Sequence, residues 1–232
     1  MPDKFGSDYE SARWHANPLL AAQYQMMTDA LNRLVIPIAR RASRVLEVGP
    51  GPGTWTKLLL KANPGAEYTL VDISKEMLAQ AREGLVAHKN VTFVESDLLA
   101  FESSQLFDFF FSSRAIEYMP DKRVAVEKIA SLLVPGAQGA IVTKMPKPFF
   151  NRVHGRAVSA LHTGQILPRT LVRLLERSGC VVENVRIATA TLPGFGSARA
   201  NGWIYKLLKY VPLFFPFTLF AESYLITFRK RL

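Results

Sequence analysis

Short apolar runs alternate with segments of helical periodicity along most of the chain. Apolar residues at helical spacing predict helices, and Pro37 is expected to kink or end the first of them. The expected helices span residues 18–41, 54–62, 75–87, 121–133 and 168–178. The expected strands span residues 43–48, 68–71, 91–95, 107–111, 139–144, 181–189 and 221–230. This alternation predicts an α/β fold with a parallel sheet and helices on both of its faces.

The length of 232 residues fits one domain with an elaboration. Four parts are expected within it, and the pattern of alternation changes after Met145. They are an N-terminal helical cap (1–41), a core that binds a ligand (42–189), an apolar insert rich in aromatic and basic residues (190–220), and a last strand with a tail (221–232). Pro146 and the basic stretch up to Arg156 are expected to lead into a helical lid.

Composition narrows the choice of partner and of cellular compartment. Apolar residues make up 49% and charged residues 21%, as in ordinary globular proteins. A formal charge of +10 admits an anionic partner or surface, although it also serves solubility alone. The single cysteine, Cys180, excludes an internal disulfide and a thiolate metal cluster, and its apolar surroundings predict a packed core thiol. Residues 1–17 have no apolar run typical of a signal peptide, so a cytoplasmic location is expected.

A glycine-rich segment follows the first predicted strand. Gly49, Gly51 and Gly53 stand at every second position, and Glu47 lies just upstream. Glycine allows a backbone to approach a ligand closely and tolerates positive φ. The spacing is G-x-G-x-G, and Thr54 stands where a dinucleotide-binding fingerprint has its third glycine. This departure favours a loop around an amino-acid or ribose group over one that binds a pyrophosphate at a helix N-terminus.

Polar residues also follow the next three predicted strands. Asp72 ends the second strand, Asp97 follows the third, and Ser112 and Ser113 follow the fourth. A carboxylate such as that of Asp72 can accept hydrogen bonds from both hydroxyls of a ribose. Ligands bind at the carboxyl ends of strands in such sheets, so these residues predict one shared site.

These segments together resemble the class I S-adenosylmethionine-dependent methyltransferases, in the broad branch that includes quinone-biosynthesis and other small-molecule enzymes. The resemblance covers roughly residues 40–190, and Ala137 replaces the second glycine that the family usually has before its fifth strand. It implies a Rossmann-like, doubly wound, seven-stranded sheet that is mostly parallel and has an antiparallel last strand. The matching segments are Leu46–Gly53, Val71–Ser74, Ser96–Asp97, Phe107–Asp108, Ser113, Tyr118–Asp121 and Leu133–Gly136.

The resemblance also implies S-adenosylmethionine as cofactor and S-adenosylhomocysteine as product. The loop residues and the acidic residue before them would hold the methionine part of the cofactor: Glu47, Gly49, Pro50, Gly51 and Gly53. Other strand ends would hold the rest: Asp72 the ribose, Ile73 and Met77 the adenine face, Asp97 and the Leu98 amide the adenine edge, and Ser113 and Arg114 the methionine carboxylate and the reactive methyl.

Catalytic candidates come from segments that would cover the strand ends. His162 and His154 follow the fifth strand, and Glu117 follows the fourth. A histidine can act as a base near neutral pH, and a hydrogen-bonded structural role is the alternative. Tyr9, Trp14 and His15 lie in an N-terminal segment that could fold over the cofactor. The sequence offers no convincing constellation of metal ligands.

The insert is the second informative segment. Residues 203–220 are rich in aromatic and aliphatic side chains, but Lys206, Lys209, Pro212 and Pro216 interrupt them, so we expect no transmembrane helix. Two interpretations stay open. The segment either docks on the domain or forms a homodimer face, or it contacts a membrane surface or caps an apolar acceptor.

The expected function is methyl transfer from S-adenosylmethionine to an apolar or lipid-linked small molecule, at oxygen. The protein would be a monomer or homodimer in the cytoplasm, with peripheral membrane contact through 203–220 as an open option. RNA or DNA is a competing acceptor, but no Asn/Asp-Pro-Pro-Tyr/Phe motif follows the fourth strand and no catalytic cysteine pair exists. A non-catalytic binding protein with the same fold is the other alternative.

Overall fold

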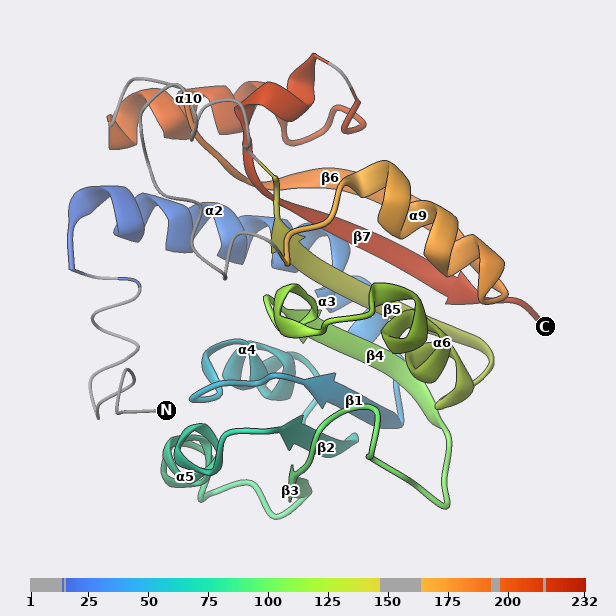
Figure 1. Ribbon diagram of the computed structural model, residues 1–232. Helices are drawn as coiled ribbons and strands as arrows, with labels where there is room; N and C mark the ends of the chain where they lie inside the picture. Colours follow the sequence, from blue (N-terminus) through green and yellow to red (C-terminus); the bar gives the residue numbers. More distant parts are fainter. Residues whose placement is uncertain (1–13, 15, 147–163, 193–196, 215) are drawn as a thin grey trace.

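A seven-stranded sheet forms the centre of the computed structural model, which describes residues 14, 16–146, 164–192, 197–214 and 216–232 (Figure 1). The strand order is β3-β2-β1-β4-β5-β7-β6. The strands are β1 (Arg44–Val48), β2 (Glu67–Asp72), β3 (Val91–Glu95), β4 (Phe107–Ser113), β5 (Leu133–Lys144), β6 (Cys180–Ala190) and β7 (Ala221–Lys230).

The strands from β1 through β5 all pair with their neighbours in parallel, whereas β7 is antiparallel to both of its neighbours, β5 and β6. The expected doubly wound, mostly parallel sheet with an antiparallel last strand is confirmed. The chain moves outward from β1 to β3 in one direction and from β4 onward in the other, so the order reverses between β1 and β4. That reversal leaves a crevice at the carboxyl ends of these strands, where ligands bind in this class of sheet.

Helices cover both faces of the sheet (Figure 1). They are α2 (Pro18–Leu34), α3 (Ile36–Ala39), α4 (Thr54–Ala62), α5 (Lys75–Gly84), α6 (Lys122–Ser131), α9 (Pro168–Arg177) and α10 (Ala198–Leu208), with 3-10 turns at Ile116–Tyr118 and Phe217–Phe220. Side chains cap several of them, as sequence patterns of this kind predict. Asn17 caps α2, Ser74 caps α5 and Asp121 caps α6. Pro37 lies at the start of the short α3, because the first helix has already ended at Leu34.

The expected boundary at Pro135-Gly136 is wrong. We expected the helix to run to residue 133 and the strand to begin at residue 139, but α6 ends at Ser131 and β5 begins at Leu133. Leu133 pairs with Phe107, and the register then shifts before Phe109 pairs with Gln138. Gly136 has a φ of 81°, so the Pro-Gly pair forms an irregularity within a long strand.

Two apolar clusters fill the space between the sheet and its helices. One includes residues of α6 and α9, and the other includes residues of α2, α3 and α4. Side chains of β4 alternate between them: Phe110 belongs to the first, while Phe109 and Phe111 belong to the second. Burial of each such ring stabilises the fold by roughly 1.5–3 kcal/mol. This strand therefore ties both layers together beside the crevice.

The insert docks on the domain through one side of α10, which lies beside α2 (Figure 1). Tyr205 is buried and donates a hydrogen bond to Asp29 of α2, with 2.8 Å between Oη and Oδ2. The Nζ of Lys209 lies 3.3 Å from the other carboxylate oxygen of Asp29. After α10, the Leu213 amide donates to the Val185 carbonyl of β6 at 3.0 Å. The inner side of the insert is thus fixed to the core.

Candidate functional site

The glycine loop between β1 and α4 has a backbone conformation that glycine adopts easily. Gly49, Gly51 and Gly53 have φ values of 71°, 57° and 83°. The Gly53 amide donates to the Pro50 carbonyl at 3.1 Å, which closes a turn. The Gly49 amide donates to the Val71 carbonyl at 2.8 Å and holds the loop against β2. The sequence therefore predicted both the place of the loop and its need for glycine.

The three glycines differ in what surrounds them. A Cβ at Gly49 would overlap the side chain of Ala115, so glycine is required there by close packing as well as by φ. A Cβ at Gly53 would lie 3.3 Å from Leu85. A Cβ at Gly51 would have no atom within 4 Å, so the outer side of the loop is open. Gly51 is consequently the position where backbone can approach a ligand.

Two carboxylates lie behind and beside this loop. Asp72, at the end of β2, accepts from the Gly51 amide at 3.3 Å through Oδ2 and from the Ser74 amide at 3.0 Å through Oδ1. Burial raises the pKa of Asp72, and these amide hydrogen bonds oppose that rise. Each carboxylate oxygen has two lone pairs, so both can still accept a hydroxyl hydrogen from a ribose.

Glu47 is fully buried within β1. Its Oε2 accepts a hydrogen bond from the Thr56 hydroxyl of α4 at 2.8 Å. Burial raises the pKa of Glu47 to about 8, the negative charge of Asp72 adds to the rise, and the Thr56 hydrogen bond opposes it. Glu47 thus joins the strand to the helix that follows the loop, and its contact with a cofactor stays a prediction.

Protonation of Glu47 gives a test of this arrangement. The folded protein retains the proton up to a pKa of about 8, whereas the unfolded chain loses it near the ordinary value of 4.5. The unfolding free energy should therefore fall as pH rises from 5 to 8, by at most about 1.4 kcal/mol per pH unit from this group. Glu47→Gln should reduce that slope in denaturant titrations. Glu95→Gln, at an exposed strand end, is the control, and equal slopes in both variants would contradict the assignment.

The residues expected beside the adenine lie along the next strand ends. Ile73 directly follows Asp72 and is 71% exposed, so its side chain is available to pack on the face of an aromatic ring. Met77 and Leu98 are buried. Asp97 is exposed, and its Oδ1 accepts from the Leu99 amide at 2.7 Å, so it shapes its own turn. The roles of these four residues stay predictions.

Ser113 and Arg114 lie where β4 ends beside the glycine loop. Arg114 has a φ of 71°, and its amide donates to the Val142 carbonyl of β5 at 2.9 Å. Its Nε lies 2.7 Å from Oε1 of Glu117, an ion pair whose alignment falls short of a hydrogen bond. A non-glycine residue at positive φ is uncommon and is often found at functional sites. The residue that follows this strained position, Ala115, packs on Gly49. Arg114 therefore lies close to the glycine loop.

Glu117 is buried and engaged by several donors. Its Oε1 accepts from the Lys144 amide at 2.7 Å and from the Thr143 hydroxyl at 3.2 Å, in addition to the contact with Arg114. A Cβ at Gly164 would overlap the Glu117 carbonyl, so the chain packs closely against this residue. These contacts favour a positioning role for Glu117, which holds Arg114 and the end of β5, over the role of a proton acceptor.

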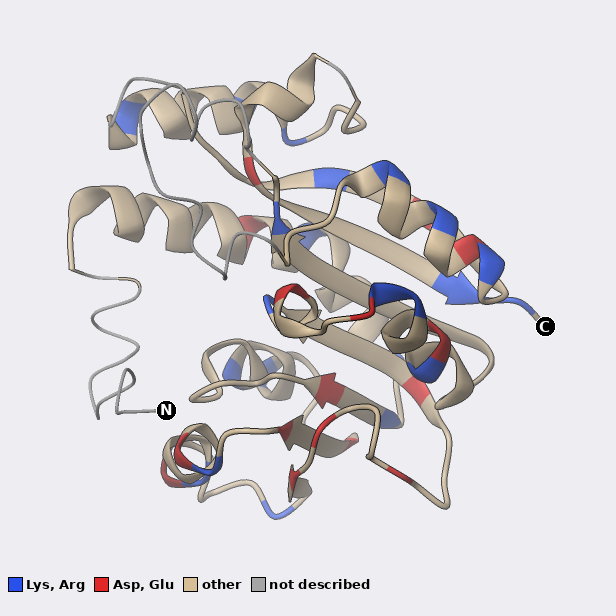
Figure 2. Ribbon diagram, in the orientation of Figure 1, with Lys and Arg blue, Asp and Glu red and all other residues tan. Residues whose placement is uncertain are grey.

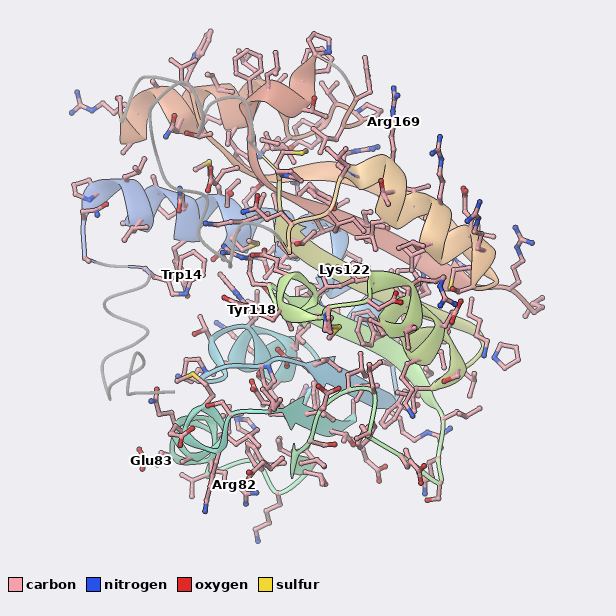
Figure 3. The ribbon with its side chains drawn as sticks, viewed as in Figure 1. Trp14, Arg82, Glu83, Tyr118, Lys122 and Arg169 are labelled. Carbon is pink, nitrogen blue, oxygen red and sulfur yellow. The ribbon has the colours of Figure 1, made fainter. Side chains whose placement is uncertain are left out.

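Four candidates lie outside the described residues: His154, His162, Tyr9 and His15. Trp14 is described and buried, on the same side of the molecule as Tyr118 (Figure 3). Its ring lies 5.4 Å from that of Trp55 and 5.7 Å from that of Tyr24. Trp55 belongs to the first turn of α4, directly after the glycine loop. Trp14 therefore packs beside the helix that follows the glycine loop, and the expected fold of the N-terminal segment over the cofactor stays a prediction.

A cavity of about 260 Å³ lies beside Arg114. Its walls come from Trp14, from α2, from the ends of β5 and β6, and from the beginning of β7. The lining is Trp14, Leu20, Gln23, Met27, Arg114, Lys144, Thr189, Glu222 and Ser223. Two cations and one carboxylate are among these residues, and the Nζ of Lys144 lies 3.8 Å from Oε1 of Glu222. The lining thus combines charged and polar side chains from the strand ends with the apolar side chains of Trp14, Leu20 and Met27.

Sequence reasoning missed most of this cavity. Lys144 ends a predicted strand, and the rule that selected Asp72 could have selected it as well. Glu222 and Ser223 begin β7, and because that strand is antiparallel its start lies at the edge where parallel strands end. Only knowledge of this direction could have identified them.

The strand-end residues fit a cofactor that has a ribose and a planar base. Asp72 offers carboxylate oxygens for hydroxyl groups, Ile73 offers an exposed apolar surface, and the open side of Gly51 admits close approach. Arg114, which lines the cavity, is followed in the chain by Ala115, which packs on Gly49 of the glycine loop. One site for a donor and a neighbouring one for an acceptor is the arrangement that a group-transfer enzyme requires.

Known proteins share both the sequence and the fold. Residues 45–136 match the methyltransferase domain family. Trans-aconitate 2-methyltransferase of Shigella flexneri is 33% identical over 141 residues, which cover 61% of this chain and 54% of that protein, so the chain spans about half the length of this curated relative. Among solved structures, the N-methyltransferase NodS of Bradyrhizobium japonicum, in complex with S-adenosyl-L-homocysteine, has a TM-score of 0.61 at 15% identity and covers 94% of this chain and 90% of its own. An S-adenosylmethionine-dependent methyltransferase of Mesorhizobium loti has a TM-score of 0.62 at 20% identity, with coverage of 90% and 98%.

The fold and the site define a Rossmann-like methyltransferase domain. Residues 45–136 match the methyltransferase domain family, and the fold is that of the class I S-adenosylmethionine-dependent methyltransferases, as the motifs predicted. S-adenosylmethionine is the cofactor of that family.

Proposed function

We propose that this protein transfers a methyl group from S-adenosylmethionine to an oxygen of a small acceptor that carries a carboxylate. The observation that supports the acceptor class is the cavity whose lining contains the two cations Arg114 and Lys144, which pair with Glu117 and Glu222 in the absence of an acceptor. The volume of about 260 Å³ suits a small molecule. The name of the Shigella relative, a trans-aconitate methyltransferase, points to the same class of acceptor.

The chemistry required of the protein is modest. When bound, S-adenosylmethionine supplies an electrophilic methyl group on its sulfonium. The chain holds the two reactants in line and excludes water, and such positioning can provide much of the rate. A carboxylate acceptor is ionised at neutral pH, so no residue has to remove its proton. Arg114 and Lys144 would orient the acceptor by charge-assisted hydrogen bonds, and Trp14 would cover it.

The tight packing around Glu117 supports this division of labour. Its carboxylate already accepts from the Lys144 amide and the Thr143 hydroxyl and pairs with Arg114. It therefore fixes the side chain of Arg114 and the backbone of Lys144. A base for a less acidic acceptor would have to come from another residue, and His154 and His162 stay predictions in that role.

The expected apolar or lipid-linked acceptor also stays a prediction. Leu20, Met27 and Trp14 give the cavity an apolar side, which accommodates a hydrocarbon portion of limited size. Peripheral contact with a membrane through residues 203–220 stays a prediction too, as does the choice between monomer and homodimer. Among the described residues, no helix has the length and hydrophobicity that crossing a bilayer requires.

Two measurements test the proposal. Calorimetric titration of the folded protein with S-adenosylmethionine separates an enzyme from a binding protein of the same fold, and no binding would refute the enzyme. Transfer of a radiolabelled methyl group to a panel of mono-, di- and tricarboxylic acids, with the matching alcohols and amides as controls, tests the acceptor. A methyl ester releases labelled methanol in mild alkali, whereas an ether or a methylamine does not.

Lys144→Met should weaken the acceptor interaction selectively. Loss of a hydrogen-bonded charged partner costs about 1.5–3 kcal/mol, so the KM for the acceptor should rise about 10- to 100-fold. The Kd for S-adenosylmethionine should stay unchanged. Lys89→Met removes an exposed cation from the turn before β3 and is the matched control. An unchanged KM in Lys144→Met would remove Lys144 from the acceptor site.

A further inference from the structure

The outward side of α10 carries exposed apolar side chains that the proposed reaction leaves unexplained. Trp203 is 65% exposed and Leu207 is 55% exposed, four residues apart on the same side of the helix. Tyr210, just after α10, and Phe214 continue the exposed series. Soluble proteins place single apolar residues on their surfaces, whereas a contiguous group of this kind marks an interaction site.

Cations accompany these apolar side chains. Arg199 and Lys206 are exposed on α10, at positions that share the outward side with Trp203 and Leu207. From residue 184 to residue 221 the sequence contains no Asp or Glu. In Figure 2, α10 accordingly shows basic residues and no acidic ones. We call the surface formed by Arg199, Trp203, Lys206, Leu207 and Tyr210 the outward face of α10.

The opposite side of α10 is already occupied. Tyr205 is buried against Asp29, and Ile204 and Leu208 pack against the core. Cations also lie over the ring of Tyr210, with Arg33 5.0 Å and Lys209 5.1 Å from its centroid. The outward face is thus presented in a fixed orientation by a helix that is docked on α2.

We propose that the outward face of α10 docks this protein on bilayers that contain anionic phospholipids. Tryptophan, tyrosine and leucine insert at the level of the headgroups, while arginine and lysine attract anionic lipids. The positive charge of the whole chain, +10, favours the same surface at longer range. Contact of this kind is peripheral, since the helix has only 11 residues.

A second copy of the chain fits the outward face less well. A symmetric dimer places the same patch of both copies together. Arg199 and Lys206 would then meet their own counterparts, and no acidic residue lies within the patch to compensate them. A bilayer supplies the missing negative charge.

The tryptophans provide a direct probe. Trp203 is 65% exposed, whereas Trp14 and Trp55 are 5% and 6% exposed. A change in tryptophan fluorescence when vesicles bind should therefore come from Trp203. Vesicles with 30% phosphatidylglycerol in phosphatidylcholine, added to the full chain, should shift the emission to the blue and reduce quenching by acrylamide. Trp203→Phe should abolish both optical changes and retain vesicle binding. Vesicles of phosphatidylcholine alone should have little effect.

Charge reversal separates this patch from the net charge. Arg199→Glu with Lys206→Glu should reduce co-sedimentation with the anionic vesicles at least tenfold. Arg169→Glu with Arg173→Glu changes the net charge of the chain by the same amount but on α9, where Arg169 points outward (Figure 3). This control should reduce co-sedimentation only slightly. Trp203→Ser with Leu207→Ser should also lose binding, whereas Val86→Ser with Val181→Ser, at exposed positions elsewhere, should not.

Three results would overturn the proposal. They are no co-sedimentation of the wild type, equal losses for the α9 and α10 charge reversals, and conversion of a dimer to a monomer by Trp203→Ser with Leu207→Ser in analytical ultracentrifugation. The last result would assign the outward face to a homodimer. Binding of S-adenosylmethionine by every variant shows that the proteins are folded, and it keeps failure here distinct from failure of the proposed enzyme activity.

Discussion

Replacement of Asp72 by alanine is expected to weaken binding of S-adenosylmethionine about 10- to 100-fold. The carboxylate holds the Gly51 and Ser74 amides and retains lone pairs for the ribose hydroxyls. Loss of a charged hydrogen-bond partner costs about 1.5–3 kcal/mol, and each 1.4 kcal/mol corresponds to a tenfold change in Kd. Calorimetric titration of the purified variant gives the affinity directly.

Asp108→Ala is a matched control for this substitution. Asp108, in β4, also accepts backbone amide hydrogens, from Ser43 and Arg44 at 3.0 Å, but it does so at the opposite edge of the sheet. Both variants should lose stability in denaturant titrations, because each removes the acceptor of half-buried backbone amides, those of Gly51 and Ser74 or that of Arg44. Only Asp72→Ala should lose affinity for the cofactor. Equal affinities in the two variants would place the ribose elsewhere.

Gly51→Ala is expected to raise the Kd for the cofactor about tenfold or more. The same substitution should lower the free energy of unfolding only modestly. The added methyl group meets no protein atom within 4 Å, so it projects into the open space on the ligand side of the loop. The φ of 57° adds a cost of roughly 1–2 kcal/mol for any residue with a Cβ. The expected loss of affinity is therefore steric and separate from folding.

Gly179→Ala measures the backbone cost alone. Gly179 has a φ of 81° and also has open space at its Cβ, but it lies between α9 and β6, at the edge of the sheet opposite the site. Both alanine variants should show similar decreases in the free energy of unfolding. If Gly51→Ala bound S-adenosylmethionine as tightly as Gly179→Ala, the open side of the loop would not face the cofactor.

The prediction of the cofactor half of the site rests on determinants that are local in sequence, and the structure confirms the place of the loop and of the strand ends. The glycine spacing from Gly49 to Gly53 and the polar residues at successive strand ends are visible without a structure, since each lies next to an apolar run. The parallel order of these strands follows from the intervening helices. What the spacing could not show is which glycine is packed and which is open, because Ala115 is distant in sequence from Gly49.

The acceptor half could not be predicted in the same way. Lys144 and Glu222 meet because β7 runs antiparallel beside β5, which places the beginning of one strand at the end of the other. The insert separates β7 from β6, so local patterns give no information on this neighbour. The Pro135-Gly136 irregularity misled the assignment for a related reason: pairing of Leu133 with Phe107 outweighs the local preference of Pro-Gly for a turn.

Strand β7 enters the sheet between β5 and β6, and this has an evolutionary consequence. The segments expected to bind the methyl donor lie between β1 and the end of β4, while most of the lining of the proposed acceptor cavity comes from α2, which precedes β1, and from Lys144 and later residues. If this cavity binds the acceptor as proposed, mutations in β7 and at the end of β6 would alter the choice of acceptor without changing the glycine loop. Descendants of such a chain can diversify in substrate while they inherit an unaltered donor site, since function is determined by sites carried on a common fold.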